Sequence, residues 1–178
     1  RRRSRKNSRM MLVWLTLGIL IIVAIGIGVL FGGAPFVPTR RAWIEQALTL
    51  SRLGKNDVIV DLGSGNGAVL ALALERGAKY AVGYEINPGL ALWSRLVLRR
   101  FKGRFSIRTT DFFRSDLPID TTVIYMFQTS GVMRRIKPYL LSQKPHLQCK
   151  KLRVVCFGFA IPGETVVHTS GGMNLYEF

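Results

Sequence analysis

The sequence predicts an α/β domain with a mostly parallel sheet, preceded by one N-terminal transmembrane helix. Strand and helix patterns alternate along residues 39–178, and such alternation is typical of parallel sheets with right-handed crossovers. Residues 10–33 contain no charged side chain. We therefore expect four segments: a basic head at residues 1–9, a transmembrane helix at 10–33, a linker at 34–38 and a domain at 39–178.

The apolar segment is long enough to cross a bilayer. A helix of about 24 residues spans about 36 Å, whereas the hydrocarbon core is about 30 Å thick. A secretory signal peptide is the alternative, but its apolar region would be shorter and would end at a small-residue cleavage site. We expect an uncleaved, single-pass membrane anchor.

The charge of the chain points to anionic partners. The formal net charge is +16, and the first nine residues include six basic side chains and no acidic one. A surface this basic favours either lipid headgroups or nucleic acid. The two cysteines, Cys149 and Cys156, form neither a disulfide framework nor a zinc pattern. We expect a bilayer with anionic headgroups as one partner and no metal site, and the sequence does not indicate an oligomeric state.

The elements of the domain follow in order from the linker. Thr39 is the expected N-cap of a helix with the apolar stripe Trp43, Ile44, Ala47 and Leu48, which ends before Gly54. The other expected helices cover residues 68–74, a segment after Asn87-Pro88, and residues 132–141. The expected strands are 58–60, 81–84, 105–109, 122–127 and 152–161, with a closing hairpin of 165–168 and 175–178.

A glycine-rich turn follows the first of these strands and opens the next helix. It reads Asp61-Leu-Gly63-Ser64-Gly65-Asn-Gly67. Glycines allow the backbone to turn tightly and to approach a ligand closely. In an open parallel sheet this turn lies at the carboxyl end of the strand, where ligands bind. Glu85 ends the second strand, and a carboxylate there can accept hydrogen bonds from two ribose hydroxyls.

The spacing of the turn separates two classes of ligand. A dinucleotide-binding turn has the pattern G-x-G-x-x-G, whereas this chain has G-x-G-x-G with Asp61 two residues before the first glycine. A carboxylate at that position would crowd a pyrophosphate. It suits a cationic ligand, such as S-adenosylmethionine, which carries an ammonium and a sulfonium group and no phosphate.

The segment Asp61-Leu-Gly-Ser-Gly-Asn-Gly67 resembles the first motif of class I S-adenosylmethionine-dependent methyltransferases. The resemblance implies a Rossmann-like class I methyltransferase domain over residues 39–178, with S-adenosyl-L-methionine as its cofactor. It assigns the methionine end to Asp61 and the glycine turn, the ribose to Glu85, and the adenine amino group to Asp111. The full set of expected cofactor residues is Asp61, Gly63, Ser64, Gly65, Gly67, Glu85, Asp111 and Phe112.

A narrower resemblance concerns the methyl acceptor. Phe36-Val-Pro-Thr39, Val82-Gly-Tyr-Glu-Ile-Asn-Pro88 and Trp93-Ser-Arg95, behind one hydrophobic segment, are similar to membrane-associated protein lysine methyltransferases. Mitochondrial members of that family modify the ATP synthase c-subunit and the adenine nucleotide translocase. The chain departs from their pattern at Asn66 and Gly89. The resemblance implies N-methylation of a lysine in a membrane protein.

Other functions stay open at this point. The acceptor could instead be a lipid or a quinone, or the chain could bind the cofactor without catalysis. Methylation of nucleic acid is disfavoured, because the Asn/Asp-Pro-Pro-aromatic motif of enzymes that act on nucleobase nitrogens is absent from Tyr125-Met-Phe-Gln-Thr129.

Methyl transfer to lysine sets two requirements on the site. The reaction is an in-line displacement that needs alignment and a dry site rather than a metal. The amine, whose free pKa is about 10.4, must lose its proton, and desolvation against aromatic rings favours the neutral form. Phe113 and Phe127, with Phe112, are candidates for that aromatic wall, although all three also suit a core. No catalytic base is identified.

The orientation of the anchor is left unresolved by the sequence. The basic head favours an N-terminus in the cytoplasm, which would place the domain outside. S-adenosylmethionine occurs in the cytoplasm and the mitochondrial matrix, which favours the reverse. We give the cofactor more weight and expect the domain on the cytoplasmic or matrix side.

Overall fold

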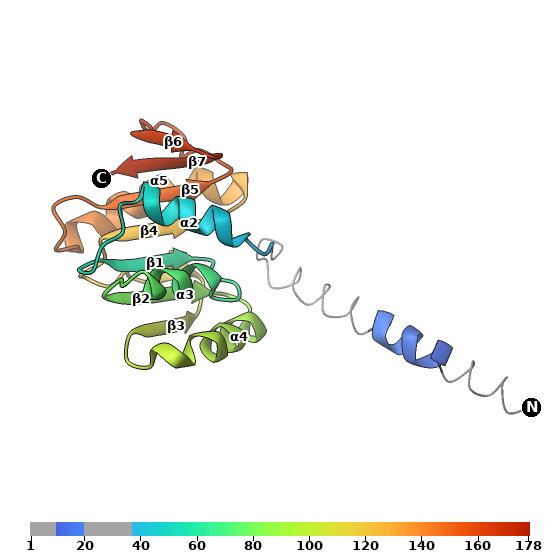
Figure 1. Cartoon of the computed structure of the whole chain (residues 1–178). Coiled ribbons are helices and arrows are strands. Elements are labelled where there is room, and N and C mark those ends of the chain that lie inside the picture. Colours follow the sequence, from blue (N-terminus) through green and yellow to red (C-terminus); the bar gives the residue numbers. More distant parts are fainter. Residues whose placement is uncertain (1–9, 20–36) are drawn as a thin grey trace, which may run out of the picture. The chain divides into compact units, whose positions relative to one another are not determined.

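The computed structural model describes residues 10–19 and 37–178 (Figure 1). Contacts divide the chain into two units, Arg1–Pro35 and Phe36–Phe178, and each is described by itself. Residues 10–19 are helical. Within the described ranges no helix is both long enough and apolar enough to cross a membrane. Most of the expected transmembrane helix, residues 20–33, lies outside the described residues, so that helix stays a prediction.

The second unit is built on a seven-stranded sheet with the order β3-β2-β1-β4-β5-β7-β6. β1 to β5 pair in parallel, and β7 runs antiparallel to both β5 and β6. The predicted mostly parallel sheet is therefore confirmed. The strands are β1 Val58–Leu62, β2 Tyr80–Glu85, β3 Phe105–Thr109, β4 Val123–Met126, β5 Arg153–Phe157, β6 His168–Ser170 and β7 Met173–Glu177.

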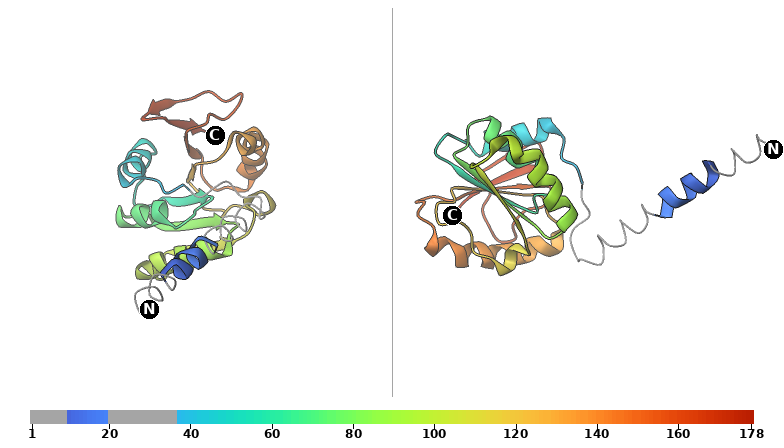
Figure 2. Two further views of the ribbon diagram at one scale, coloured as in Figure 1. Left: turned by 90° about the vertical axis from the view of Figure 1, so that its right-hand side faces the viewer. Right: turned by 90° about the horizontal axis from the view of Figure 1, so that it is seen from below.

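Helices cover both faces of the sheet, as Figure 2 shows in its left view. Alternate residues of β1 point to opposite faces, so Ile59 joins one core with α2, α3 and α4, and Val60 joins the other with α5. The helices are α2 Arg41–Leu50, α3 Ala68–Glu75, α4 Pro88–Leu98 and α5 Ser130–Gln143, with 3₁₀ turns η1 Arg99–Phe101, η2 Phe112–Arg114 and η3 Lys144–His146.

Three expected boundaries differ in the structure. Thr39 is not the N-cap of α2, because the carbonyl of Arg40 accepts the first helical hydrogen bonds and Arg40 is the cap. β5 ends at Phe157 rather than residue 161, since Gly158 has φ of 84° and leaves the extended conformation. The closing hairpin is present, but its turn is Gly171-Gly172, with φ of 55° and 76°, which suits a two-residue hairpin turn.

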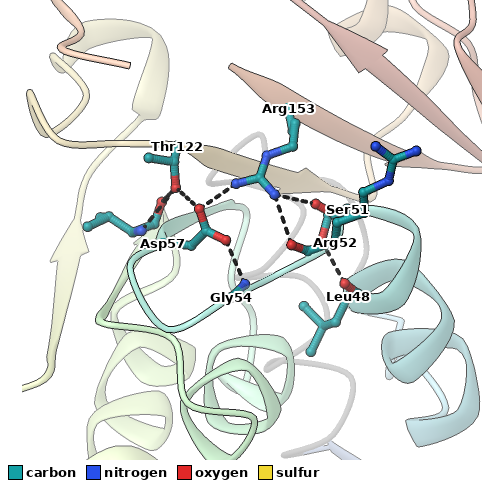
Figure 3. A network of polar contacts seen from close by, with 8 residues as sticks. Leu48, Ser51, Arg52, Gly54, Asp57, Thr122 and Arg153 are labelled. Carbon is teal, nitrogen blue, oxygen red and sulfur yellow. Dashed lines mark hydrogen bonds and ion pairs between the residues drawn. The ribbon is translucent and has the colours of Figure 1, made fainter. Parts of the chain in front are cut away.

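A partly buried polar network joins the amino ends of three strands (Figure 3), which are the ends opposite the glycine turn. Asp57 precedes β1, and its carboxylate pairs with the guanidinium of Arg153 at the start of β5. Thr122, just before β4, donates to the same carboxylate at 2.7 Å. Arg153 also donates to the carbonyl oxygen of Ser51 at 2.6 Å. The network ties the end of α2 to the sheet.

Candidate active site

The glycine turn lies between β1 and α3, as the sequence predicts, and is bonded to the end of β2. Gly63, Gly65 and Gly67 have φ of 94°, 52° and 79°, in the left-handed region that favours glycine. The N–H groups of Gly63 and Ser64 both donate to the carbonyl oxygen of Tyr84 at 2.9 Å. The N–H of Gly67 donates to the carbonyl oxygen of Ser64 at 2.8 Å.

Glu85 holds the same turn through its side chain. Its Oε2 accepts a hydrogen bond from the N–H of Gly65 at 2.8 Å, and its Oε1 accepts one from the N–H of Asn87 at 2.8 Å. The residue is buried at 7% exposure. Asn87 in turn caps α4. A carboxylate can accept about four hydrogen bonds, so Glu85 retains capacity for ribose hydroxyls.

These bonds bear on the class of ligand that the turn can hold. Phosphate-binding turns direct free backbone N–H groups at the anion. Here the N–H groups of Gly63, Ser64, Gly65 and Gly67 are all taken by oxygens of the chain itself. Asp61 and Glu85 add two carboxylates. The turn therefore suits a ligand with positive charge better than a pyrophosphate.

Asp61 gives the strongest evidence that the turn suits a positively charged ligand. It is 2% exposed, and within residues 37–178 no hydrogen bond or ion pair is found for its carboxylate. Desolvation raises the pKa of Asp61 from 3.8 to about 8, and the negative charge of Glu85 adds to the shift. An unpaired buried carboxylate is costly, and an ammonium or sulfonium group beside it would offset that cost.

Tyr125 lies next to Asp61 in the neighbouring strand, which the sequence analysis did not foresee. The two residues are register partners in the parallel pair β1–β4. Tyr125 is 3% exposed, and its hydroxyl makes no hydrogen bond of normal geometry among the described residues. Burial, followed by the charge of Asp61, raises the pKa of this hydroxyl, although the nearby Thr39 side chain acts to lower its pKa. The alternation pattern predicted the strand of Tyr125 but not the neighbour of that strand.

Gln128 is a second residue that sequence reasoning missed. It follows β4, and its Nε2 donates to the carbonyl oxygen of Leu62 at 2.5 Å. A Cβ at Gly63 would collide with the Gln128 amide. The post-β4 loop therefore covers the first glycine of the turn, and the absence of a side chain at residue 63 makes this contact possible.

Two other glycines allow close packing around the turn. A Cβ at Gly83 would lie 2.6 Å from Ser64 Oγ and 2.8 Å from Leu70 Cδ1, so the bare backbone of β2 lets the turn and α3 pack against it. A Cβ at Gly67 would collide with Ser94 on α4. The side chain of Ser64 thus faces the sheet, and its Oγ has no partner among the described residues.

Asp111 lies at the carboxyl end of β3, close to the loop that holds Glu85. Its Oδ1 accepts a hydrogen bond from the N–H of Phe113 at 3.0 Å and so caps η2. The N–H of the preceding Thr110 donates to the carbonyl oxygen of Glu85 at 3.1 Å. The structure brings Asp61, Glu85 and Asp111 to one edge of the sheet, and the adenine contact of Asp111 stays a prediction.

The structure does not gather the three phenylalanines into one aromatic wall. Phe112 and Phe113 pack together with Tyr139 of α5, with ring centroids 4.4 to 5.8 Å apart. Phe127 packs against Phe157, at 4.8 Å, in the core on the other face of the sheet. Phe113 and Phe127 therefore pack on opposite faces of the sheet, and their contact with an acceptor amine stays a prediction.

Two surface hollows lie outside the glycine turn. One, of about 580 Å³, lies between α2 and β6 and is lined partly by Gln46, His168 and Ser170. The other, of about 220 Å³, borders Thr39 and Ala68, the first residue of α3. Neither hollow is lined by Asp61 or Glu85. The candidate site is therefore identified by the chemistry of the carboxylates and backbone groups around the glycine turn.

The strand order and the acid-flanked turn together are those of a class I S-adenosylmethionine-dependent methyltransferase. The ANTKMT methyltransferase domain family matches residues 61–168 of the chain. The chain therefore belongs to this family, and S-adenosyl-L-methionine is its cofactor.

Known proteins with similar sequences and structures agree with this assignment. A protein-lysine N-methyltransferase of Saccharolobus islandicus is 31% identical over 148 residues, covering 79% of this chain and 88% of that protein. The mouse lysine N-methyltransferase of the ATP synthase c-subunit is 32% identical over 138 residues, covering 77% of this chain and 53% of its own length. An RNA methyltransferase of Salinibacter ruber, solved with S-adenosyl-L-homocysteine, has a TM-score of 0.71 and 26% identity. The match covers 80% of this chain and 92% of that protein.

Proposed function

We propose that this methyltransferase transfers the methyl group of S-adenosylmethionine to the ε-amino group of a lysine in a protein. The observation that carries the proposal is the 31% identity to a protein named as a lysine N-methyltransferase, along 88% of that protein. The mouse relative is named for the same type of acceptor. The chain spans about half of the mouse protein, so acceptor specificity is part of the proposal.

In this proposal the chain binds the cofactor through the acid-flanked turn. Asp61 offsets the positive charge of the methionine end, Glu85 accepts from the ribose, and Asp111 accepts from the adenine. Gly63, Ser64, Gly65 and Gly67 form the backbone of the turn, and Phe112 contacts the bound cofactor. The bound cofactor supplies an electrophilic methyl group on a sulfonium. The chain supplies alignment and exclusion of water, which are the requirements of a displacement.

The acceptor lysine must reach the site in its neutral form. Burial next to apolar side chains lowers the pKa of an amine, so a buried approach removes the need for a strong base. Phe113 and Phe127 lie on opposite faces of the sheet, and we propose that one of them borders the amine. Phe127 follows β4 directly and precedes Gln128, which contacts the glycine turn. We favour Phe127 for this reason.

We also propose that the apolar segment of residues 10–33 anchors the enzyme in a bilayer, on the side where the cofactor occurs, and that the acceptor is a membrane protein. The support is the uncharged length of this segment, which suffices for a bilayer. Confinement of enzyme and acceptor to one membrane would raise their effective concentration.

Radiolabelled methyl transfer tests the acceptor. The full chain is incubated with membranes and S-adenosylmethionine carrying a labelled methyl group, and the product is split into protein and lipid fractions. We expect the label in protein, as methylated lysine after acid hydrolysis, and none with the Asp61→Ala variant. Label in the lipid extract would show a lipid or quinone acceptor, and tight cofactor binding without any label would show a non-catalytic protein.

A further inference from the structure

Helix α4 exposes an apolar face that its packing leaves uncovered. Leu92, Trp93 and Leu96 are 57%, 58% and 51% exposed, and they lie together on one side of the helix because residues three and four apart are neighbours. The opposite side, with Ala91, Ser94 and Leu98, is buried against α3 and the sheet. A half-exposed tryptophan between two exposed leucines is unusual for a soluble face and marks an interaction surface.

The segment that carries this face has basic side chains and no acidic one. Residues 86–110 contain no acidic side chain, and their basic side chains are Arg95, Arg99, Arg100, Lys102, Arg104 and Arg108. Of these, Arg100 pairs with a carboxylate, that of Glu75. Arg95, Arg104 and Arg108 donate to neutral oxygens, which leave their charge uncompensated. The α4–β3 edge of the sheet, located in Figure 1, therefore carries both exposed apolar and basic side chains.

We propose that the outer face of α4, with the basic residues of η1 and β3, docks on an anionic lipid surface. Interfacial helices bind bilayers through leucine and tryptophan on one face and basic side chains beside them. Tryptophan favours the headgroup level, and basic residues near the surface are attracted to anionic lipids. The complementarity of this edge to such a surface is both apolar and electrostatic.

Nucleic acid and a protein partner are the competing occupants. A single-stranded nucleic acid binds through stacking on several aromatic rings beside a basic groove, whereas Trp93 is the one aromatic ring on the exposed face of α4, between aliphatic side chains. Aliphatic side chains gain nothing from a phosphate backbone and gain much from a lipid interface.

The docking surface also lies close to the candidate active site. α4 begins at Pro88, and the N–H of its capping residue Asn87 donates to Glu85 Oε1 at 2.8 Å. A bilayer on the outer face of α4 would therefore hold the cofactor end of the sheet near the membrane surface. The proposal concerns the position of the enzyme and does not depend on which acceptor it methylates.

Tryptophan fluorescence in the full chain tests this docking directly. The chain contains three tryptophans, Trp14, Trp43 and Trp93. One variant, Trp14→Phe with Trp43→Phe, keeps Trp93, and a matched control, Trp14→Phe with Trp93→Phe, keeps Trp43 on α2. Both are mixed with vesicles that contain brominated phosphatidylcholine, with or without phosphatidylserine. We expect the anionic vesicles to quench Trp93 at least about twofold more than Trp43. Equal quenching of the two tryptophans would overturn the proposal.

A charge reversal separates the lipid from the other occupants. In the Trp93 variant, Arg99→Glu with Lys102→Glu should remove most of the quenching and leave methyl transfer to a short lysine peptide unchanged. Quenching of Trp93 by added RNA without quenching by brominated lipid would overturn the proposal in favour of nucleic acid. Protection of Trp93 from acrylamide without vesicles would overturn it in favour of a protein contact.

Discussion

Glu85 Oε2 accepts a hydrogen bond from the backbone N–H of Gly65 at 2.8 Å, which joins the end of β2 to the turn after β1. The same carboxylate accepts from Asn87 at the start of α4. Glu85, which we expect to bind the ribose, therefore also stabilises the conformation of the glycine turn. Cofactor binding and the shape of the turn depend on one side chain.

This dual role predicts different effects for two substitutions of Glu85. Glu85→Ala leaves the N–H groups of Gly65 and Asn87 without acceptors, and should lower the free energy of unfolding by about 2–3 kcal/mol and abolish cofactor binding. Glu85→Gln keeps one carbonyl acceptor, so it should cost about half as much stability. Urea unfolding and calorimetry measure both. Equal stability of the two variants would show that the hydrogen bonds of Glu85 do not stabilise the glycine turn.

Asp61 predicts a dependence of stability on pH. Its pKa is about 8 in the fold and 3.8 ordinarily, so between these values the folded chain holds a proton that the unfolded chain has lost. Stability from this group is therefore lost as pH rises from about 4 to about 8. The side chain of the Asp61→Asn variant does not titrate. The free energy of unfolding of this variant, relative to that of the native chain, should therefore be higher at pH 9 than at pH 5 by about 4 kcal/mol. Urea unfolding of the cofactor-free chains at both pH values measures this difference, and an unchanged difference would show that burial does not raise the pKa.

Gly83 predicts a steric effect without a change in charge. A methyl group at this position would meet Ser64, Leu70 and Ile107 within 2.8 Å, so Gly83→Ala should destabilise the fold by about 1–3 kcal/mol. Gly131→Ala is the matched control, because its nearest neighbours lie at 3.9 Å, and it should change stability little. Thermal unfolding compares the two variants. Similar melting temperatures would mean that α3 can shift away from β2.

The largely buried ion pair of Arg153 and Asp57, at the amino ends of the strands, predicts a larger effect on stability than an exposed ion pair. Arg153→Met leaves the Asp57 carboxylate without its cation and should cost about 3 kcal/mol. Lys151→Met removes an exposed partner of Glu177 and should cost less than about 1 kcal/mol. Urea unfolding of both variants checks this. An equally small loss for Arg153→Met would show that solvent reaches the Asp57 carboxylate.

The sequence predicted the elements of the site better than the contacts between them. Asp61, Glu85 and Asp111 all lie at carboxyl ends of strands, because acid and glycine positions are local features that follow directly from strand patterns. The bond between Glu85 and Gly65 was not predicted, since it joins residues 20 positions apart. The pairing of Asp61 with Tyr125 depends on the strand order, which periodicity does not give.

The predicted ends of helices and strands were wrong where the conformation of a single residue sets the boundary. The carbonyl of Arg40, not the side chain of Thr39, begins α2. The dipeptide Gly171-Gly172 favours a two-residue hairpin turn and could have corrected the bounds of the last two strands. The packing of Phe113 and Phe127 on opposite faces of the sheet was also not predicted, because the strand patterns do not show which face a residue beyond a strand end packs against.

The central claim is that the buried carboxylate of Asp61 receives the positive charge of the cofactor. Calorimetric titration of the full chain with S-adenosylmethionine at pH 7, repeated in two buffers of different ionisation enthalpy, tests it most directly. We predict release of about one proton on binding to the native chain, because the cation ionises a group whose pKa is about 8. The Asp61→Asn variant should release no proton and should bind the cofactor at least about 30-fold more weakly. Unchanged affinity in Asp61→Asn, with heats that do not depend on the buffer, would contradict the claim.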